Sequence, residues 1–415
     1  MSAPRTLFRD VDVIDGTGAA PFRAHVLVEG NRIAAVLEGR PPAAMSADQV
    51  IDGDGATLMP GLIESHAHLS FVDVAISTEL GRIPPEEHTL LTARHARTLL
   101  EHGFTSCVSA ASAKARLDIV VRNAIAAGDI PGPRLLAASP ELTVTSGLGD
   151  ARLAHMHQES FAIVCDGADA FRKVAREMCR EGVDTLKINV SGDTMLPAAR
   201  SRHTVMTEAE VAAVCEVARA HELQVAAHAR NAAAIKLCLR HGVRIIYHAN
   251  FADADALDQL AAQRDTVFVA PTIGASVALL ERGPQFGRLR APGERAIVEE
   301  ELHAGIANMR ALKARGVRVL PGGDYGFAFN PNGCNARDLE HFVKLLGFSP
   351  LEAIAAATSQ GGQLMGRSHE LGQVREGFLA DLLLVDGDPL ADIAILQDRG
   401  RLRAIMQDGV FHKAP

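Results

Sequence analysis

Both ends of the chain carry short runs of alternating and β-branched apolar residues that stop at glycine, aspartate or asparagine. Near the start these runs are LFRDVDVIDG, RAHVLVEGNRIAAVLEG and QVIDGDGATLMPG, and near the end they are GFLADLLLVDGDPL and LRAIMQDGVFHK. This pattern is typical of strands joined by turns. Because strands from the two ends of one chain can pair, we predict a small composite β-sandwich domain from residues 1–58 and 368–415.

Between residues 59 and 367, short apolar runs alternate with longer amphipathic stretches. The expected strands are GLIESHAHLS, FTSCVSAA, RLLAAS, TLKINVS, LQVAAHA, RIIYHAN, VFVAPT and RVLPGGD, and helical patterns such as TEAEVAAVCEVARAH separate several of them. The alternation predicts an α/β fold with parallel strands and crossover helices, and its length fits a (β/α)8 TIM barrel. The alternative, a doubly wound sheet, lacks support because the sequence has no GxGxxG or GxxxxGK[ST] phosphate loop.

Composition narrows the class of protein and of partner. The chain is 47% hydrophobic and 22% charged, as expected for a folded globular protein. A net charge of −8 with no run of lysine or arginine argues against nucleic acid and against an anionic membrane surface. No long apolar run or secretory leader is recognisable, and the 6 cysteines form no CxxC pair. We therefore expect a cytoplasmic protein with reduced thiols and a small-molecule substrate.

Residues that bind metals stand where the expected apolar strands end. His66 and His68 are one residue apart in a strand, so their side chains share a face. His228 and His248 each close a later strand, and Asp324 follows two glycines after another. The carboxyl ends of barrel strands meet at one rim, so these five side chains are expected together. Taken singly, each could equally be a core histidine or an ordinary turn aspartate.

Lys187 lies inside the otherwise apolar strand TLKINVS. Burial disfavours the charged ammonium and lowers its pKa, which makes the amine nucleophilic. A neutral amine can add CO2 to form a carbamate, whose two oxygens can bridge two cations. The alternative is a lysine that reaches the strand end or pairs with a carboxylate. With the imidazoles and the aspartate, the set supplies the N and O ligands that suit zinc or another divalent first-row metal.

The ordered pattern HxH, Lys, His, His, Asp resembles that of the amidohydrolase superfamily of metal-dependent hydrolases. PGLIESHAHLS resembles the first-strand motif of that superfamily, and FLADLLLVDGDPL resembles its C-terminal signature. The resemblance spans nearly the whole chain, including the split β-domain. Within the superfamily, the chain is most similar to the branch of Xaa-Pro dipeptidases, imidazolonepropionase-like proteins, ochratoxin-degrading amidases and phenylurea hydrolases.

The resemblance implies a centre of two divalent metal ions, with zinc as the first expectation. One ion would be held by His66, His68 and Asp324, the other by His228 and His248, and carboxylated Lys187 and a hydroxide would bridge them. The hydroxide would attack an amide or peptide C–N bond, and Asp324 would pass its proton to the leaving nitrogen. An N-acyl amino acid, a dipeptide, an anilide or a urea-like compound would be the substrate. Relatives often assemble, so a homo-oligomer is expected.

Substrate-binding residues are less marked, because YHAN replaces the acidic residue and glycine that many relatives carry around the second histidine. Tyr247 and Tyr325 each adjoin an expected ligand and could stabilise an oxyanion, or simply pack with a satisfied hydroxyl. Arg230 could hold a substrate carboxylate through two parallel hydrogen bonds, or be structural. His155 and His157 lie in a loop and could touch the substrate or face solvent.

Three alternative functions stay open at this point. A deaminase on the same fold is disfavoured by Lys187 and by the absence of a glutamate shortly after His228. An ester or lactone hydrolase would use the same attack and differs only in its substrate. A non-catalytic scaffold of this fold would be expected to lose metal ligands, and this chain keeps all of them.

Overall fold

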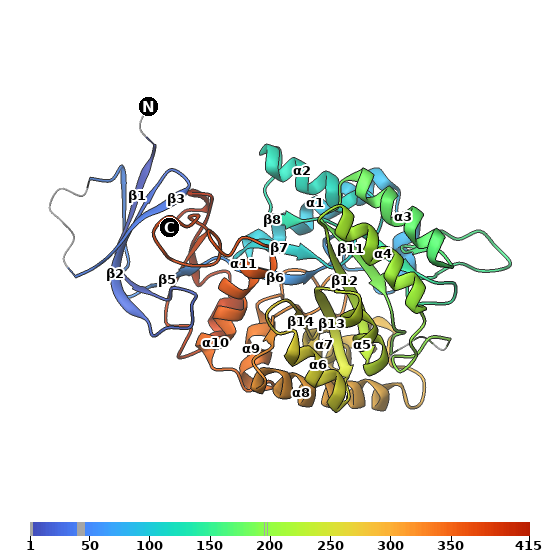
Figure 1. Ribbon diagram of the computed structural model, residues 1–415. Coiled ribbons are helices and arrows are strands. Elements are labelled where there is room, and N and C mark those ends of the chain that lie inside the picture. The colour runs from blue at the N-terminus through green and yellow to red at the C-terminus, as the bar shows by residue number, and fades with distance from the viewer. Residues whose placement is uncertain (1–2, 40–45, 195, 197) are drawn as a thin grey trace.

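The computed structural model describes residues 3–39, 46–194, 196 and 198–415 of the chain. Figure 1 shows two regions side by side, a sheet built from both termini and a larger region of strands covered by helices. The described strands and helices alternate through the larger region, as the sequence pattern predicts.

The terminal sheet has 8 strands, in the order β18-β17-β16-β5-β1-β2-β3, with β4 paired to β1. Its strands are β1 (Arg5–Val13), β2 (Phe22–Glu29), β3 (Arg32–Glu38), β4 (Gln49–Asp52), β5 (Thr57–Pro60), β16 (Leu382–Val385), β17 (Leu402–Gln407) and β18 (Val410–Lys413). The two ends of the chain meet where β16 runs antiparallel to β5. Alternate residues such as Phe8, Leu58 and Leu384 form a separate apolar core. Both termini thus build one sheet, and its description as a sandwich stays a prediction.

The larger region contains two parallel sheets. The first has the order β6-β7-β8 and the second β10-β9-β11-β12-β13-β14-β15. Their bounds are β6 (Leu62–Ala67), β7 (Phe104–Ser109), β8 (Arg134–Leu136), β9 (Ala138–Thr143), β10 (Ile163–Val164), β11 (Thr185–Asn189), β12 (Gln224–Asn231), β13 (Ile245–Phe251), β14 (Phe268–Ala270) and β15 (Arg318–Val319). An isolated parallel bridge between Ala67 and Tyr325 links β6 to the segment after β15. Closure into one continuous barrel stays a prediction.

Helices cover these strands on the outside (Figure 1). They are α1 (Pro85–Glu101), α2 (Leu117–Ala127), α3 (Ala168–Glu181), α4 (Glu208–Ala220), α5 (Ala232–Arg240), α6 (Ala254–Ala262), α7 (Ile273–Arg282), α8 (Glu294–Ala314), α9 (Arg337–Lys344), α10 (Pro350–Ala356) and α11 (Ser359–Leu364). Short 3-10 helices are η1 (Leu69–Phe71), η2 (Ser77–Arg82), η3 (Gly283–Phe286) and η4 (Ile393–Gln397). Local sequence fixes several starts, as where Thr207 and Glu210 form a capping box on α4.

Every residue of β6, β11 and β14 is buried, as are nearly all of β12 and β13. Parallel strands buried on both faces are apolar throughout, because helices cover one face and side chains fill the other. A polar side chain within such a strand is therefore conspicuous. Those described below lie at or near the carboxyl ends, the edge where active sites of this architecture are built.

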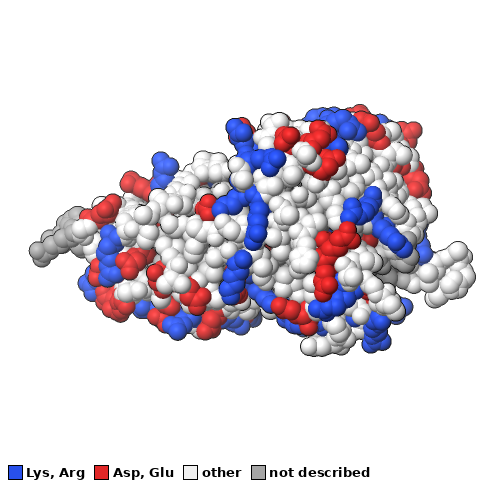
Figure 2. Space-filling model, turned by 90° about the horizontal axis from the view of Figure 1, so that it is seen from below, with Lys and Arg blue, Asp and Glu red and all other residues white. Residues whose placement is uncertain are grey.

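Within the described residues, no helix is long and apolar enough to cross a membrane. Figure 2 shows basic and acidic side chains on the same face of the molecule, over both the terminal sheet and the larger region.

Candidate metal centre and active site

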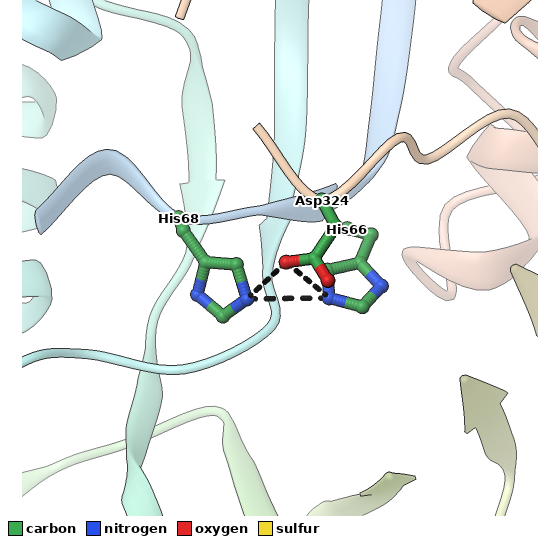
Figure 3. A group of neighbouring side chains, drawn as sticks. All are labelled: His66, His68 and Asp324. Carbon is green, nitrogen blue, oxygen red and sulfur yellow. Dashed lines mark hydrogen bonds and ion pairs between the residues drawn. The ribbon is translucent and has the colours of Figure 1, made fainter. Parts of the chain in front are cut away.

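Three of the expected ligands converge at one point. His66 and His68 come from the end of β6, and Asp324 comes from the segment after β15 (Figure 3). The Nε2 atoms of the two histidines are 3.2 Å apart, and Asp324 Oδ1 lies 3.1 Å from His68 Nε2 and 3.5 Å from His66 Nε2. Among the described residues, this is the one group of three such donors whose ligand atoms lie within 4.8 Å of one another.

The protonation states of this group suit a cation. Burial lowers the pKa of His66 well below its usual value, so its imidazole is neutral. Burial opposes ionisation of Asp324, but the His66 and His68 imidazoles outweigh it and hold the pKa of the carboxyl below its usual range. Neutral imidazole nitrogens and an ionised carboxylate are the forms that bind zinc. The donor set therefore fits a divalent first-row metal.

The glycines before Asp324 let this loop approach β6. A Cβ on Gly322 would lie 2.8 Å from His66 Cβ, closer than any side chain tolerates. Asp338, buried on α9, accepts hydrogen bonds from the Gly322 amide at 2.9 Å and from the Tyr325 hydroxyl at 3.3 Å. Asp324 itself has φ 58°, a left-handed conformation that non-glycine residues rarely adopt. Packing thus holds this carboxylate in a strained position, as is common at functional sites.

The other expected ligands line the same cavity, whose volume is about 340 Å³. His248 lies 5.6 Å from His66 and 4.2 Å from His228, measured between ring centroids. Its Nδ1 is 2.7 Å from Thr272 Oγ1, which leaves Nε2 without a described partner. His228 Nε2 donates to the Gly192 carbonyl at 2.9 Å. All six expected ligands therefore line one cavity. His228 and His248, however, do not converge on one point as His66, His68 and Asp324 do.

Lys187, on β11, is only 1% exposed. Its Nζ is 3.9 Å from Glu141 Oε1 and 4.9 Å from the centroid of the Tyr247 ring. Burial lowers the pKa of this amine, although Glu141 and Asp324 oppose the shift. The side chain thus has the environment expected of a reactive lysine, with a carboxylate nearby but beyond hydrogen-bond distance.

Sequence reasoning missed two carboxylates that line this cavity. Glu141, on β9, accepts a hydrogen bond from Asn189 Nδ2 at 2.9 Å. Asp193 follows the Lys187 strand and lies 3.7 Å from His228 Nε2. The signal for Glu141 was present, because a carboxylate two residues after the expected strand RLLAAS is near a strand end. Asp193 gave no such signal, since it stands in a loop.

Arg230 lines the cavity, but its donors are already engaged. Its guanidinium donates to Asp193 through Nε at 3.0 Å and Nη2 at 2.8 Å. Nη1 donates to Asn250 Oδ1 at 3.0 Å and to Glu301 Oε2 at 3.2 Å. Since a guanidinium has five N–H donors, one is left. Asp193, Asn250 and Glu301 accept from these donors, so the expectation that Arg230 holds a substrate carboxylate through two parallel bonds stays a prediction and would require an exchange of partners.

The two tyrosines are fully buried behind the metal centre and do not line the cavity. Tyr247 donates to the Ser65 carbonyl at 3.3 Å, and its ring packs on His66 with 3.9 Å between centroids. Tyr325 donates to Asp338. Both hydroxyls are satisfied, which favours the packing role that the sequence left as the alternative, and the oxyanion role stays a prediction.

His155 and His157 are exposed and line a different cavity of about 840 Å³. His157 pairs with Glu159 at 3.1 Å. The expectation that they touch a substrate at the metal centre is not supported, because the loop that carries them places both side chains outside its cavity.

Comparison with known proteins agrees with this site. Residues 57–411 match the Amidohydrolase family. This chain belongs to the amidohydrolase family. It is therefore a metal-dependent hydrolase acting on C–N bonds, in a family that generally uses divalent ions, and its fold is of the TIM-barrel type. The resemblance inferred from the sequence is confirmed.

Individual relatives share most of their length with this amidohydrolase. The ochratoxinase of Aspergillus niger is 26% identical over 377 residues, covering 86% of this chain and 76% of that protein. The imidazolonepropionase of Rubrobacter xylanophilus is 26% identical over 451 aligned positions, covering 99% of each. A prolidase solved in complex with N-methylphosphonate-L-proline superposes with a TM-score of 0.88 at 28% identity, covering 99% of this chain and 100% of the prolidase.

Proposed function

We propose that this amidohydrolase hydrolyses an amide or peptide C–N bond of a small molecule with the help of two divalent cations. One observation carries the proposal: His66, His68 and Asp324 converge in a cavity that also contains the buried amine of Lys187. The relatives support the bond class, since they are named ochratoxinase and prolidase. The substrates to expect are N-acyl amino acids, dipeptides, anilides and ureas.

His66, His68 and Asp324 would hold one cation, and His228 and His248 would hold the other. Lys187 would bind both as its carbamate, which forms when the neutral amine adds CO2 and releases a proton. When bound, two such cations lower the pKa of a shared water and polarise the substrate carbonyl. Zinc is the first candidate, because imidazole and carboxylate ligands suit it.

Asp324 is the group placed to move protons. Its carboxylate is ionised and lies within reach of both histidines. It would accept the proton of the attacking water and deliver it to the leaving nitrogen as the C–N bond breaks. Phe71, whose ring stacks on His68 at 3.9 Å, and Phe327 line the cavity beside it and would exclude bulk water.

The test is a substrate panel on protein purified without chelator. The panel contains N-acyl amino acids, dipeptides, anilides, phenylureas, aryl esters and lactones, and ammonia release is followed in parallel. We expect amide or urea cleavage that disappears on chelation and returns with zinc or manganese. Asp324→Asn should lose both activity and metal, whereas Asp386→Asn, an exposed aspartate of the terminal sheet region, should lose neither. Two results would overturn the proposal. One is cleavage of the esters alone, and the other is release of ammonia without hydrolysis of any amide or urea of the panel.

A further inference from the structure

Of the two arginines that line the metal-centre cavity, one has carboxylate partners among the described residues and the other has none. The carboxylates of the cavity are Glu141, Asp193 and Asp324, and its lysine and arginines are Lys187, Arg230 and Arg288. Glu141 lies beside Lys187, Asp193 binds Arg230, and Asp324 lies between the two histidines of β6. Arg288 is the one charged residue of the cavity without such a partner among the described residues.

Arg288 has no hydrogen bond or ion pair from its side chain to any described residue, and the remaining residues of the chain include no aspartate or glutamate. It follows the turn at Gly287 (φ 77°) that ends η3, and its amide donates to the Gly283 carbonyl at 3.0 Å. The backbone is therefore fixed, while the guanidinium keeps its donors. An arginine in a cavity with unused donors is suited to a planar anion such as a carboxylate.

The rest of the cavity wall is largely apolar. Phe71 packs edge-on against Phe161 and Phe327, with 5.8 Å and 5.6 Å between ring centroids, and Phe327 stacks on Phe329 at 5.4 Å. Leu279 of α7 completes the wall near Arg288. A mostly apolar pocket with a few placed polar groups fixes the orientation of a ligand through those groups.

We infer that Arg288 determines specificity by binding a carboxylate of the substrate, while the four phenylalanines receive an apolar or aromatic group. This inference rests on the proposed function and narrows its substrate to an N-acyl amino acid or dipeptide with a free carboxylate. Neutral anilides and ureas fit less well, because they leave Arg288 without a counter-charge in the cavity.

The test compares N-benzoyl-L-phenylalanine with its C-terminal carboxamide and with neutral benzanilide. A charge-assisted hydrogen bond changes binding by about 10- to 100-fold. The native enzyme should prefer the acid over the carboxamide by that factor in kcat/KM. Arg288→Gln should abolish the preference, mainly through KM for the acid, and should leave the carboxamide unchanged.

The matched control is Arg290→Gln, which removes the same charge from an exposed residue of the same loop that does not line the cavity. Equal effects of the two variants, or equal rates on acid and carboxamide in the native enzyme, would overturn the inference and leave the proposed function standing. If no C–N bond of the three compounds is cleaved, the proposed function is in question, and calorimetry with N-benzoyl-L-phenylalanine decides the subsite. Binding weakened only by Arg288→Gln supports it, and an absence of saturable binding contradicts it.

Discussion

Replacing Asp338 by leucine should lower the metal affinity of the site, although Asp338 is not an expected metal ligand. Asp338 touches no expected ligand, yet it anchors both sides of Asp324 by accepting hydrogen bonds from Gly322 and Tyr325. Leucine has the same branched shape, is somewhat larger and accepts no hydrogen bond, so the variant removes both anchors without leaving a cavity. Asp324 would then have less to hold it in its left-handed conformation.

The size of the effect follows from the two lost bonds. A buried donor left without a partner costs about 1–3 kcal/mol, so the two together cost about 2–6 kcal/mol. If the whole cost falls on the metal-bound arrangement of the loop, metal affinity drops by about 30- to 20,000-fold. Tyr325→Phe removes only the weaker anchor, and its cost should stay near 1 kcal/mol, or about fivefold in affinity.

The assay is competition for zinc between the protein and a chelating dye, together with urea unfolding of the metal-free form. We expect the order native, Tyr325→Phe, Asp338→Leu in decreasing affinity. Turnover of Tyr325→Phe should fall no further than its metal content. Native zinc affinity in Asp338→Leu would refute the anchoring, and a fully loaded Tyr325→Phe with about 10²-fold lower kcat would support the oxyanion role.

Three further predictions concern charges and packing. Arg230→Met leaves the buried Glu301 and the half-buried Asp193 without their partner and should lower the free energy of unfolding by about 3–5 kcal/mol, measured by urea titration; a change below about 1 kcal/mol would contradict the network. Hydrogen bonds from Arg32 and a neighbouring arginine lower the pKa of Glu370 from 4.5 to about 2. The stabilisation that the ionised Glu370 carboxylate provides is therefore complete above pH 4.5 and is lost as the pH falls through 2. Unfolding at pH 7 should show Glu370→Gln to be about 1 kcal/mol less stable, with the gap closing in acid; a constant gap would exclude ionisation as its source. Tyr247→Phe should cost about 1 kcal/mol and leave kcat nearly unchanged in steady-state assays, whereas a loss of about 10²-fold would mean that the phenol acts on the substrate.

Much of the fold could be predicted because its elements leave clear local patterns. Buried parallel strands are continuous apolar runs, so a histidine or lysine inside one is visible in the sequence, as with His228 and Lys187. The family pattern then gave the order of the ligands. Boundaries of the sheets and their closure depend on long-range pairing, which no local pattern specifies.

The substrate side could not be predicted because its residues take their roles from distant partners. Arg230 donates to Glu301, 71 positions away, and its position next to His228 in the sequence does not reveal that partner. Tyr325 neighbours Asp324 in the chain, but its hydroxyl turns toward α9. Arg288 stands in a charged loop of the sequence. Its position in the cavity without a carboxylate partner becomes visible only in the folded structure.

The most direct test of the account is the metal content per chain of protein purified without chelator, combined with its intact mass under native and acidic conditions. Two metal ions per chain, with a native mass increase equal to one CO2 that acid removes and Lys187→Met lacks, is the result that the account predicts. One metal ion and no CO2 adduct would contradict the two-metal centre and assign Lys187 a different role.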